Sequence, residues 1–401
     1  MTLALGLAGS VLLAVGHLWV LGVLLLLAAW WLLRDGSVRE VLVACALWTL
    51  PLLFARPLFS KDVYLYAGQA VLDDPYTQGP SAHPGPLFDA VDSYWRDLPS
   101  LYGPLFLRLA SLVVRVTGER PLAAAYGLRL LEVVGLVLVA WALRRSATAL
   151  WLTVANPLLL LHGIAGGHND LLMIGLVVAG LGAPLPVGAA LITLGALVKA
   201  PALLALGFLP LLHGRSVRSY AVAAAVSVTT AVLGTLATGL GWGWTGNLSG
   251  GNALKSLLSV STGFGVLIGS VPVGHAVGLA LTGLLVLALL AAAPRIGVLR
   301  ALGLAFLVVA VLSPVVQPWY LLWPLVVLAP VVGRRGLLAL AAASAVLCLL
   351  VLPSGRHIIR PPLYGVPMLL VGATAYAASR MTPHGMGTPA ASSAHLPTGP
   401  P

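Results

Sequence analysis

The stretch LAAAYGLRLLEVVGLVLVAWALRR, residues 122–145, decides the fold. Its run 122–142 is apolar except for Arg129 and Glu132, and about 20 such residues cross the hydrocarbon core of a bilayer as one helix. Two arginines end the run, as is typical where a span meets the cytoplasm. Comparable apolar runs recur from one end of the chain to the other. The sequence therefore predicts an all-α, polytopic membrane protein.

The composition of the whole chain agrees with this class. Its 401 residues are 59% hydrophobic and 8% charged, with a mean hydropathy of +1.01, whereas soluble domains are about 25% charged. This composition excludes a cytosolic globular enzyme, a secreted disulfide scaffold and a disordered protein. The net charge of +11 lies mostly in short links and reflects membrane topology, so no nucleic-acid partner is expected. Cys45 and Cys348 lie in apolar runs and are expected to be small buried hydrophobes.

Short basic links divide the chain into spans. By the positive-inside rule these links are cytoplasmic, which sends the run 41–58 outward and the run 122–142 back inward. The segment 59–121 between them is then one long extracytoplasmic loop. The links carry Arg34 and Arg39, Arg144 and Arg145, Arg215 and Arg218, Arg295 and Arg300, and Arg334 and Arg335.

The remaining apolar runs continue this alternation within a domain covering 1–380. Residues 3–33 are too long for one upright helix and short for two, and prolines break 171–212 into three short helices. We expect about 13 spans in total. The tail 381–401, rich in Pro, Gly and Ser, is predicted to be disordered and cytoplasmic. The other expected runs are 147–164, 220–240, 264–291, 301–314, 320–331, 336–353 and 363–379.

The stretch 104–117, PLFLRLASLVVRVT, predicts an amphipathic helix in the outer interface. It is shorter than the roughly 20 residues that a span needs. Arg108 and Arg115 are seven positions apart and therefore share one helical face. If this helix crossed the membrane instead, every later loop would change side.

Six of the eleven acidic residues gather between positions 62 and 97 of the long outer loop, in a stretch that begins SKDVYLYAGQAVLDDPYTQGP at residue 60. Asp62 follows directly after the run 41–58 and is expected at the membrane surface, beside Tyr64 and Tyr66. A carboxylate at this depth acts either as a general base on a hydroxyl bound at the boundary or as a helix cap. In the second interpretation the tyrosines are interfacial belt residues.

The DDPY sequence offers further polar groups in the same loop. Asp73, Asp74 and Tyr76 either bind a polar substrate or form a plain solvated turn. The other three acids of this group of six are interpreted as residues on the soluble face of helices in the loop. These are Asp89, Asp92 and Asp97.

A second polar island, GGHND at 166–170, is predicted on the same side of the membrane as Asp62. His168, Asn169 and Asp170 either cap the helix that begins at Leu171 or bind substrate. His168 and Asp170 alone make a poor metal site, and the sequence has no metal-ligand spacing, no Ser-His-Asp order and no P-loop. No cofactor is predicted, and assistance by a divalent cation stays open.

The C-terminal half contains a third motif, SPVVQPWYLLWPL at 313–325. Trp319, Tyr320 and Trp323 are expected either as part of an interfacial aromatic belt or as the lining of a groove for an isoprenoid chain or a sugar ring. Gln317, Trp319 and Tyr320 are the candidates for substrate binding in this motif.

Three cations in the second half of the chain are candidate ligands for a phosphate. Arg356 and Arg360 are predicted on the outer side, where holding an anionic phosphate is a reason for their presence. Lys199, near Pro201 in a broken helix, is either a further phosphate ligand or a cation that snorkels to the interface.

Together SKDVYLYAGQAVLDDPY, GGHND and VQPWYLLWPL resemble the bacterial polyprenol-phosphate-mannose-dependent α-1,6-mannosyltransferases of the GT-C superfamily, over roughly 40–380. The resemblance implies a multi-pass fold in the plasma membrane with an extracytoplasmic active site. It puts Asp62 at the catalytic position and implies a polyprenyl-phosphate sugar donor, most commonly mannose. The transfer would be inverting, from a β-linked donor to a hydroxyl of a glycan or glycolipid acceptor.

Two other hypotheses compete with sugar transfer: a transporter or lipid flippase without chemistry, and a scaffold subunit with a degenerate site. Transporters place ionisable groups near the middle of the bilayer and show internal repeats. Here the acids cluster in one loop, Glu132 is the strongest mid-span acid, and no repeat is evident. The sequence therefore favours an enzyme.

Overall fold

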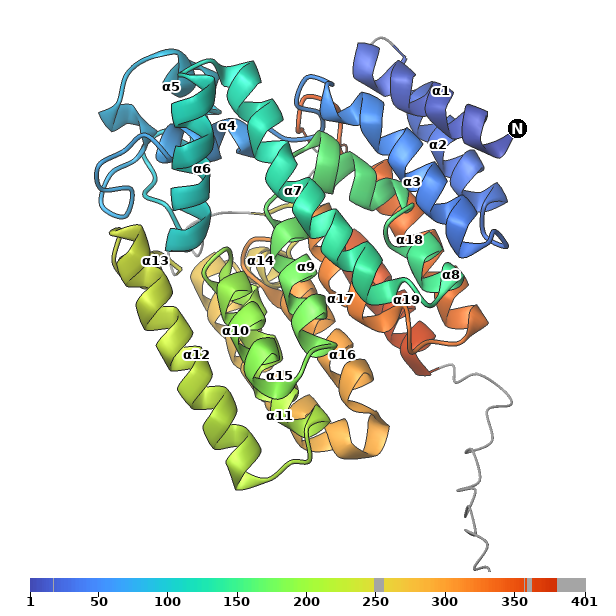
Figure 1. The fold of residues 1–401 in the computed structure, drawn as a ribbon, viewed down its shortest axis with the longest axis vertical. Helices are drawn as coiled ribbons and strands as arrows, with labels where there is room; N and C mark the ends of the chain where they lie inside the picture. The colour runs from blue at the N-terminus through green and yellow to red at the C-terminus, as the bar shows by residue number, and fades with distance from the viewer. Residues whose placement is uncertain (17, 249–255, 357, 359–362, 381–401) are drawn as a thin grey trace, which may run out of the picture.

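The computed structural model describes residues 1–380 apart from 17, 249–255, 357 and 359–362. The described residues form a bundle of helices and contain no β-strand (Figure 1). The links between α11 and α12 and between α15 and α16 lie at the lower end of the bundle in Figure 1, whereas α4, α5 and α6 lie at its upper end. The long acidic loop and these two basic links are therefore at opposite ends.

The N-terminal run, which is too long for one upright helix, contains two helices, α1 (Thr2–Val15) and α2 (Trp19–Leu32). They pack closely because glycines face each other: a Cβ atom on Gly9 would lie 2.8 Å from the carbonyl oxygen of Gly22. The third helix, α3 (Val38–Leu53), begins with a capping box between Ser37 and Glu40.

The outer loop contains three helices, α4 (Asp62–Gln69), α5 (Pro86–Ala90) and α6 (Pro104–Thr117). The stretch predicted as an amphipathic helix is thus helical throughout. Two single turns of 3₁₀ helix, η1 (Pro80–Ala82) and η2 (Ser93–Trp95), complete the loop.

The chain returns through α7 (Pro121–Leu143) and then breaks where one continuous run, 147–164, was expected. Instead α8 (Ala147–Leu152) is followed by a turn and by the π-helix η3 (Leu159–Ala165). Pro157 cannot donate a helical hydrogen bond, and the Asn156 side chain accepts one from Leu158 N at 2.9 Å, which stabilises the turn. The next helix, α9 (Asp170–Leu181), is bent by 111° from η3.

The run 171–212 forms three short helices, as predicted: α9, α10 (Leu185–Ala196) and α11 (Leu203–Leu212). A 3₁₀ turn, η4 (Ala200–Ala202), precedes α11. The rest of the chain contains α12 (Val217–Thr238), α13 (Trp244–Asn247), α14 (Val260–Leu267), α15 (Val271–Ile296), α16 (Val298–Leu312), η6 (Pro318–Leu321), α17 (Leu322–Leu328), α18 (Arg334–Cys348) and α19 (Val366–Arg380).

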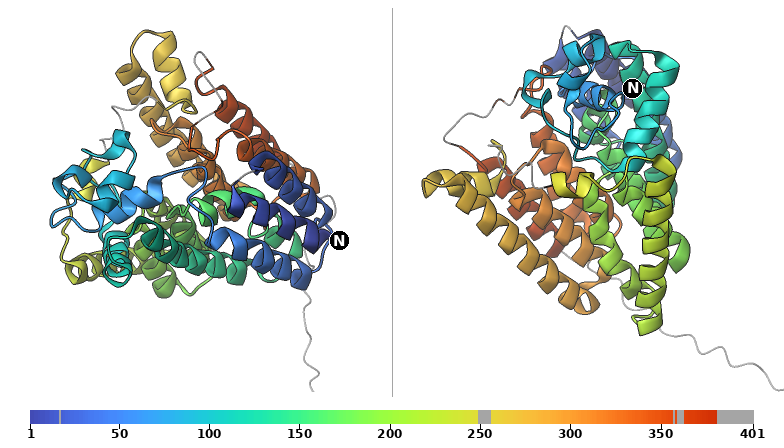
Figure 2. Two further views of the ribbon diagram at one scale, coloured as in Figure 1. Left: turned by 90° about the horizontal axis from the view of Figure 1, so that it is seen from above. Right: turned by 90° about the vertical axis from the view of Figure 1, so that its left-hand side faces the viewer.

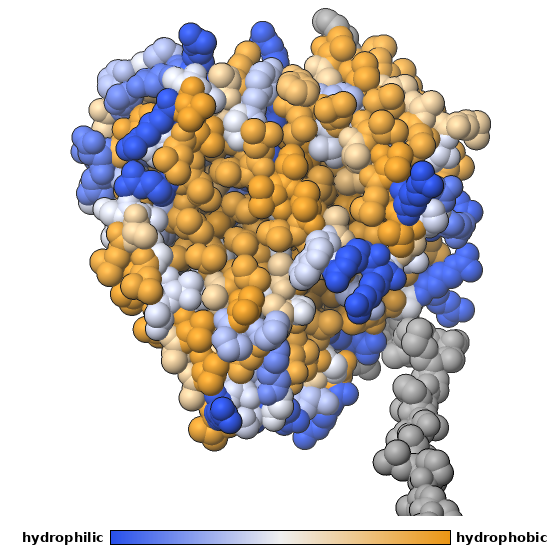
Figure 3. Space-filling model, in the orientation of Figure 1, coloured by the Kyte–Doolittle hydropathy of each residue, from blue (hydrophilic) through white to orange (hydrophobic). Residues whose placement is uncertain are grey.

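Three helices of the described residues, α7, α12 and α15, are long and apolar enough to cross a membrane, or four if the bent pair of η3 and α9 is one span. The others are shorter, so a total of about 13 spans stays a prediction. A broad apolar surface lies between polar groups at the upper left and at the lower edge (Figure 3). Figure 2 shows α12 and α15 at the outside of the bundle, where their apolar side chains are available to lipid.

Candidate active site

A cavity of about 440 Å³ lies beside the first residue of α4. Asp62 lines it from the N-terminal half of the chain, and Gln317, Trp319 and Arg356 line it from the C-terminal half. Four residues predicted from three separate motifs therefore share one cavity. The cavity combines a carboxylate, a guanidinium and an indole ring, which are groups that suit a phosphorylated sugar.

The cavity also contains residues that sequence reasoning did not select, Lys61 and Trp95, and one that it assigned to the soluble surface, Asp92. The Asp92 carboxylate accepts a hydrogen bond from Tyr94 N at 3.1 Å and so begins the turn η2 that carries Trp95. Only the folding of the loop back over α4 brings this turn to the cavity. The one available sequence signal was a tryptophan within an otherwise polar loop.

The two walls of the cavity are joined by a backbone hydrogen bond, from Phe59 N to Pro353 O at 3.0 Å. Phe59 has a φ of 64°, which is rare for a bulky residue and is strained. Its ring is held by Trp19 and His162, whose ring centroids lie 6.3 and 5.8 Å away. The surrounding structure thus fixes the turn that presents Asp62.

The Asp62 side chain is 21% exposed. Its backbone N–H donates to Ser60 Oγ at 3.0 Å, and within the described part of the chain its carboxylate accepts no hydrogen bond from the backbone of α4. The carboxylate therefore does not act as a helix cap. Burial raises the pKa of Asp62 to about 6, an effect that the positive charge of Lys199 opposes.

His168 connects the second motif to Asp62. Its ring is buried and stacks on Trp319 with ring centroids 3.6 Å apart and planes 18° apart. Its Nδ1 atom lies 3.6 Å from the Asp62 carboxylate and 3.5 Å from the hydroxyl of Tyr66, which is also buried. The three predicted motifs thus meet at this imidazole.

Asn169 is fully buried beside His168, and its side-chain amide has no hydrogen-bond partner within the described residues. Because α9 gets no side-chain cap from Asn169, the capping interpretation does not hold for this residue. Instead Glu132 of α7 accepts a hydrogen bond from Leu172 N at 3.0 Å and so satisfies the first turn of α9. Glu132 is therefore a packing element between two helices.

Asp170 and Lys199 form a buried ion pair, with the Lys199 Nζ atom 2.7 Å from the Asp170 carboxylate. The other carboxylate oxygen accepts a hydrogen bond from Trp323 Nε1 at 2.8 Å. Lys199 also lies 5.0 Å from the ring centroid of Tyr320, which stacks on Trp323. The Lys199 ammonium group is thus held in a buried ion pair, and Lys199 does not line the cavity of Asp62.

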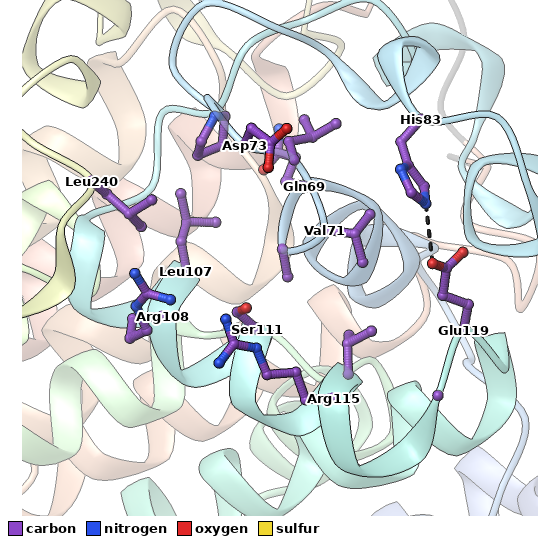
Figure 4. Close-up of a pocket in the computed structure, with 15 residues that line it drawn as sticks. Gln69, Val71, Asp73, His83, Leu107, Arg108, Ser111, Arg115, Glu119 and Leu240 are labelled. Carbon is purple, nitrogen blue, oxygen red and sulfur yellow. Dashed lines mark hydrogen bonds and ion pairs between the residues drawn. The ribbon is translucent and has the colours of Figure 1, made fainter.

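The DDPY sequence divides between two surroundings. Asp74 accepts hydrogen bonds from Thr77 Oγ1 at 2.7 Å and Tyr76 N at 3.1 Å, and these hold its pKa below the usual value. Asp74 is therefore a turn residue. Tyr76 is buried and donates its hydroxyl to Tyr102 O, whereas Asp73 lines a separate cavity (Figure 4).

Other predicted groups lie apart from the cavity or outside the described residues. Tyr64 is half-buried and does not line the cavity. Arg360 and the tail 381–401 are not among the described residues. Within those residues, no three His, Cys, Asp or Glu side chains converge on a point where they could hold a metal ion.

Models of known protein families match most of the chain. Residues 3–215 match the family model described as alpha-(1->6)-mannopyranosyltransferase, N-terminal domain, and residues 248–382 match the MptB C-terminal domain. The cavity therefore takes Asp62 from the first matched region and Trp319 and Arg356 from the second.

Several curated proteins are similar over most of their length. An alpha-(1->6)-mannopyranosyltransferase of Mycobacterium tuberculosis is 35% identical, over 72% of this chain and 65% of the relative. Alpha-(1->6)-mannopyranosyltransferase A of the same organism is 34% identical, over 78% of this chain and 69% of the relative. The protein named alpha-(1->6)-mannopyranosyltransferase B in Corynebacterium glutamicum is 29% identical, over 77% and 62%. The chain thus spans about two thirds of these relatives, and no solved structure matches it.

Proposed function

The chain belongs to the family of alpha-(1->6)-mannopyranosyltransferases, and we propose that it transfers a mannosyl residue from a polyprenyl-phosphate donor to a hydroxyl of a glycan or glycolipid acceptor. The observation that carries the proposal is the shared cavity of Asp62, Trp319 and Arg356. It supplies a base, a surface for a sugar ring and a cation in one place. The names of the relatives favour transfer chemistry over transport or a scaffold role.

In this proposal Asp62 is the general base. Its oxygen takes the proton of the acceptor hydroxyl as that oxygen forms a bond to C1 of the sugar. The bond between C1 and the phosphate oxygen breaks, and its electron pair leaves with the polyprenyl phosphate. One displacement inverts the configuration at C1, so a β-linked donor gives the α-linked product that the names of the relatives describe. A positioned base contributes about 10²–10⁴ in rate.

Arg356 is proposed to stabilise the leaving phosphate. Phosphate charge grows as the bond to C1 breaks, and a guanidinium that faces the same cavity as the base can bind it through two parallel hydrogen bonds. Trp95 and Trp319 offer indole rings for contact with the sugar. His168, stacked on Trp319 and near Asp62, would fix the relative position of ring and base.

We propose that the reaction takes place at the plasma membrane, on its extracytoplasmic face. The support is the distribution of charge: the basic links α11–α12 and α15–α16 lie at the end of the bundle opposite the loop that carries Asp62 (Figure 1). A polyprenyl donor enters from the bilayer, and a cavity at this depth lets it meet an acceptor from the aqueous side.

The test is mannosyl transfer in membranes supplied with polyprenyl-phosphate mannose. Asp62→Asn keeps the shape of the side chain but removes its basicity, so transfer should fall by roughly 10²-fold or more at normal protein level. Asp97→Asn, an exposed acid of the same loop, is the matched control and should retain activity. Full activity of Asp62→Asn would remove Asp62 from the mechanism.

A further inference from the structure

A second cavity, of about 540 Å³, lies between α6 and the segment that follows α4 (Figure 4). The proposed sugar transfer uses none of its groups. One wall is the polar face of α6, and the other comes from the outer loop. The charged and hydroxyl side chains that line it are Arg108, Ser111 and Arg115 from α6, and Asp73, His83 and Glu119 from the rest of the loop.

Opposite charges without partners face this cavity from its two walls. The side chains of Arg115 and Asp73 are both exposed, and within the described part of the chain neither makes a hydrogen bond or an ion pair. Glu119 lies 3.1 Å from the imidazole of His83. Figure 4 shows Arg115 beside Ser111 on the helix, with Asp73 across the cavity from them. A ligand with both a negative and a positive group would satisfy both walls.

The cavity lies at the end of a lipid-facing helix. Arg108 donates hydrogen bonds from Nε, at 3.0 Å, and from Nη2 to the carbonyl oxygen of Thr238, the last residue of α12. α12 is long and apolar enough to span a membrane, and only 17% of that stretch is buried in the protein. Leu240, just beyond its end, also lines the cavity. Arg108 thus ties the cavity to the end of a helix that is long and apolar enough to span a membrane.

Exposed apolar side chains lie next to this cavity on α6 and α12. Leu112 and Val116 of α6 are 48% and 88% exposed, and Leu236 of α12 is 70% exposed. α6 packs against α12, so these side chains belong to neighbouring surfaces. A charged recess next to apolar helix faces is the arrangement that suits the headgroup and acyl chains of a lipid.

We propose that this cavity binds the headgroup of a zwitterionic phospholipid of the phosphoethanolamine type. Arg115, Arg108 and Ser111 bind the phosphate, and Asp73 and Glu119 accept hydrogen bonds from the ammonium group. The positive charges of the two arginines and the negative charges of the two carboxylates cancel, which suits a ligand without net charge. An anionic lipid would leave Asp73 unpaired beside its phosphate. No aromatic ring other than the imidazole of His83 lines the cavity to stack on a sugar, which disfavours a glycan here.

The test is lipid binding by the purified full chain in detergent, measured by native mass spectrometry. The probes are dihexanoyl phosphatidylethanolamine, dihexanoyl phosphatidylglycerol, glycerophosphoethanolamine and inorganic phosphate. Arg115→Gln should weaken binding of both lipids by roughly three- to tenfold, because each carries the phosphate. Asp73→Asn should weaken the ethanolamine lipid alone and abolish its preference over the glycerol lipid.

Matched variants separate these effects from changes in charge or folding. Arg120→Gln and Asp89→Asn change the same charges at exposed positions outside the cavity and should bind as the wild type does. Arg115→Lys keeps the charge and should retain most of the binding. The unfolding midpoint of each variant is measured, and Asp62→Asn should leave lipid binding intact.

Three results would overturn the proposal. The first is wild-type binding by Arg115→Gln, and the second is an unchanged preference for ethanolamine in Asp73→Asn. The third is binding of glycerophosphoethanolamine or inorganic phosphate as tight as that of the lipid, because the acyl chains would then contribute nothing.

Discussion

At the scale of single residues, the carboxylate of Asp62 determines how activity should depend on pH. Burial raises its pKa to about 6, so this carboxylate, the proposed base, is mostly ionised at pH 7 and becomes protonated as the pH falls through 6. A carboxylate with this pKa is also a stronger base than an ordinary aspartate, which suits removal of a hydroxyl proton near neutral pH.

We therefore expect kcat/KM for mannosyl transfer to be nearly constant above pH 7 and to fall about tenfold per pH unit below pH 6. The measurement is a pH profile in membranes at constant ionic strength, with protein stability checked at each pH. An activity that stays level down to pH 5 would mean that a different group, or no protein base, accepts the proton.

The buried pair of Asp170 and Lys199 should matter for stability. Asp170→Asn leaves the ammonium group of Lys199 buried without its countercharge, which costs about 3–5 kcal/mol of unfolding free energy. The double variant Asp170→Asn/Lys199→Met removes both charges and should recover part of this loss. Tryptophan fluorescence during thermal unfolding in detergent measures both effects.

The control for this pair is Asp35→Asn, which breaks an exposed ion pair with Arg34 and should leave the unfolding midpoint unchanged. If Asp170→Asn unfolds at the wild-type temperature but loses activity, Asp170 and Lys199 contribute to the reaction more than to the fold.

At the scale of helices, the contact between α7 and α9 positions the second motif. Gly135 and Gly175 let the two backbones touch, since a Cβ atom on Gly175 would lie 2.6 Å from the carbonyl oxygen of Gly135. This contact also brings Glu132 to the first turn of α9, directly after His168 and Asn169. The close packing of these two glycines thus fixes where the GGHND segment lies beside Asp62.

Gly175→Ala should therefore lower the unfolding midpoint and reduce transfer, because a methyl group against backbone must separate α7 from α9. Overpacking of this kind costs about 1–3 kcal/mol. Gly283→Ala on α15 is the control, because a Cβ atom there meets nothing within 4 Å. Equal midpoints for the two variants would show that the helices accommodate the extra methyl group.

At the scale of the whole molecule, the proposed topology puts Asp62 and the basic links on opposite sides of the membrane. Gln78→Cys, in the outer loop, should react with a membrane-impermeant maleimide in intact cells. Arg218→Cys, at an exposed position in the first turn of α12 next to a basic link, should react only after permeabilisation. The native cysteines Cys45 and Cys348 are 6% and 1% exposed and should give little background. The reverse labelling pattern would invert the topology.

The sequence predicted much of the fold because apolar runs and basic links are local signals. The run 122–142 became α7, and 171–212 became three helices around its prolines. The run 147–164 was wrong as one helix, because hydropathy does not register the missing N–H of Pro157 or the turn that Asn156 stabilises.

The sequence predicted several of the residues that line the candidate cavity, but not which side chains pair with one another. Asp62, Gln317, Trp319 and Arg356 share a cavity, but the partner of Lys199 proved to be Asp170, 29 positions away, and Asp73 lines a different recess. Pairings across such separations depend on how helices pack. Residue type and spacing along one segment carry no information about them.

The backbone bond between Phe59 and Pro353 has an evolutionary consequence, because it joins the two regions that match separate family models. The proposed base, Asp62, and the proposed phosphate ligand, Arg356, are encoded in different halves of the gene, so a recombinant that exchanges one half between distant members would bring two unrelated walls to the same cavity. A chimaera should therefore stay active only where the backbone turn at Phe59 still meets the backbone at Pro353.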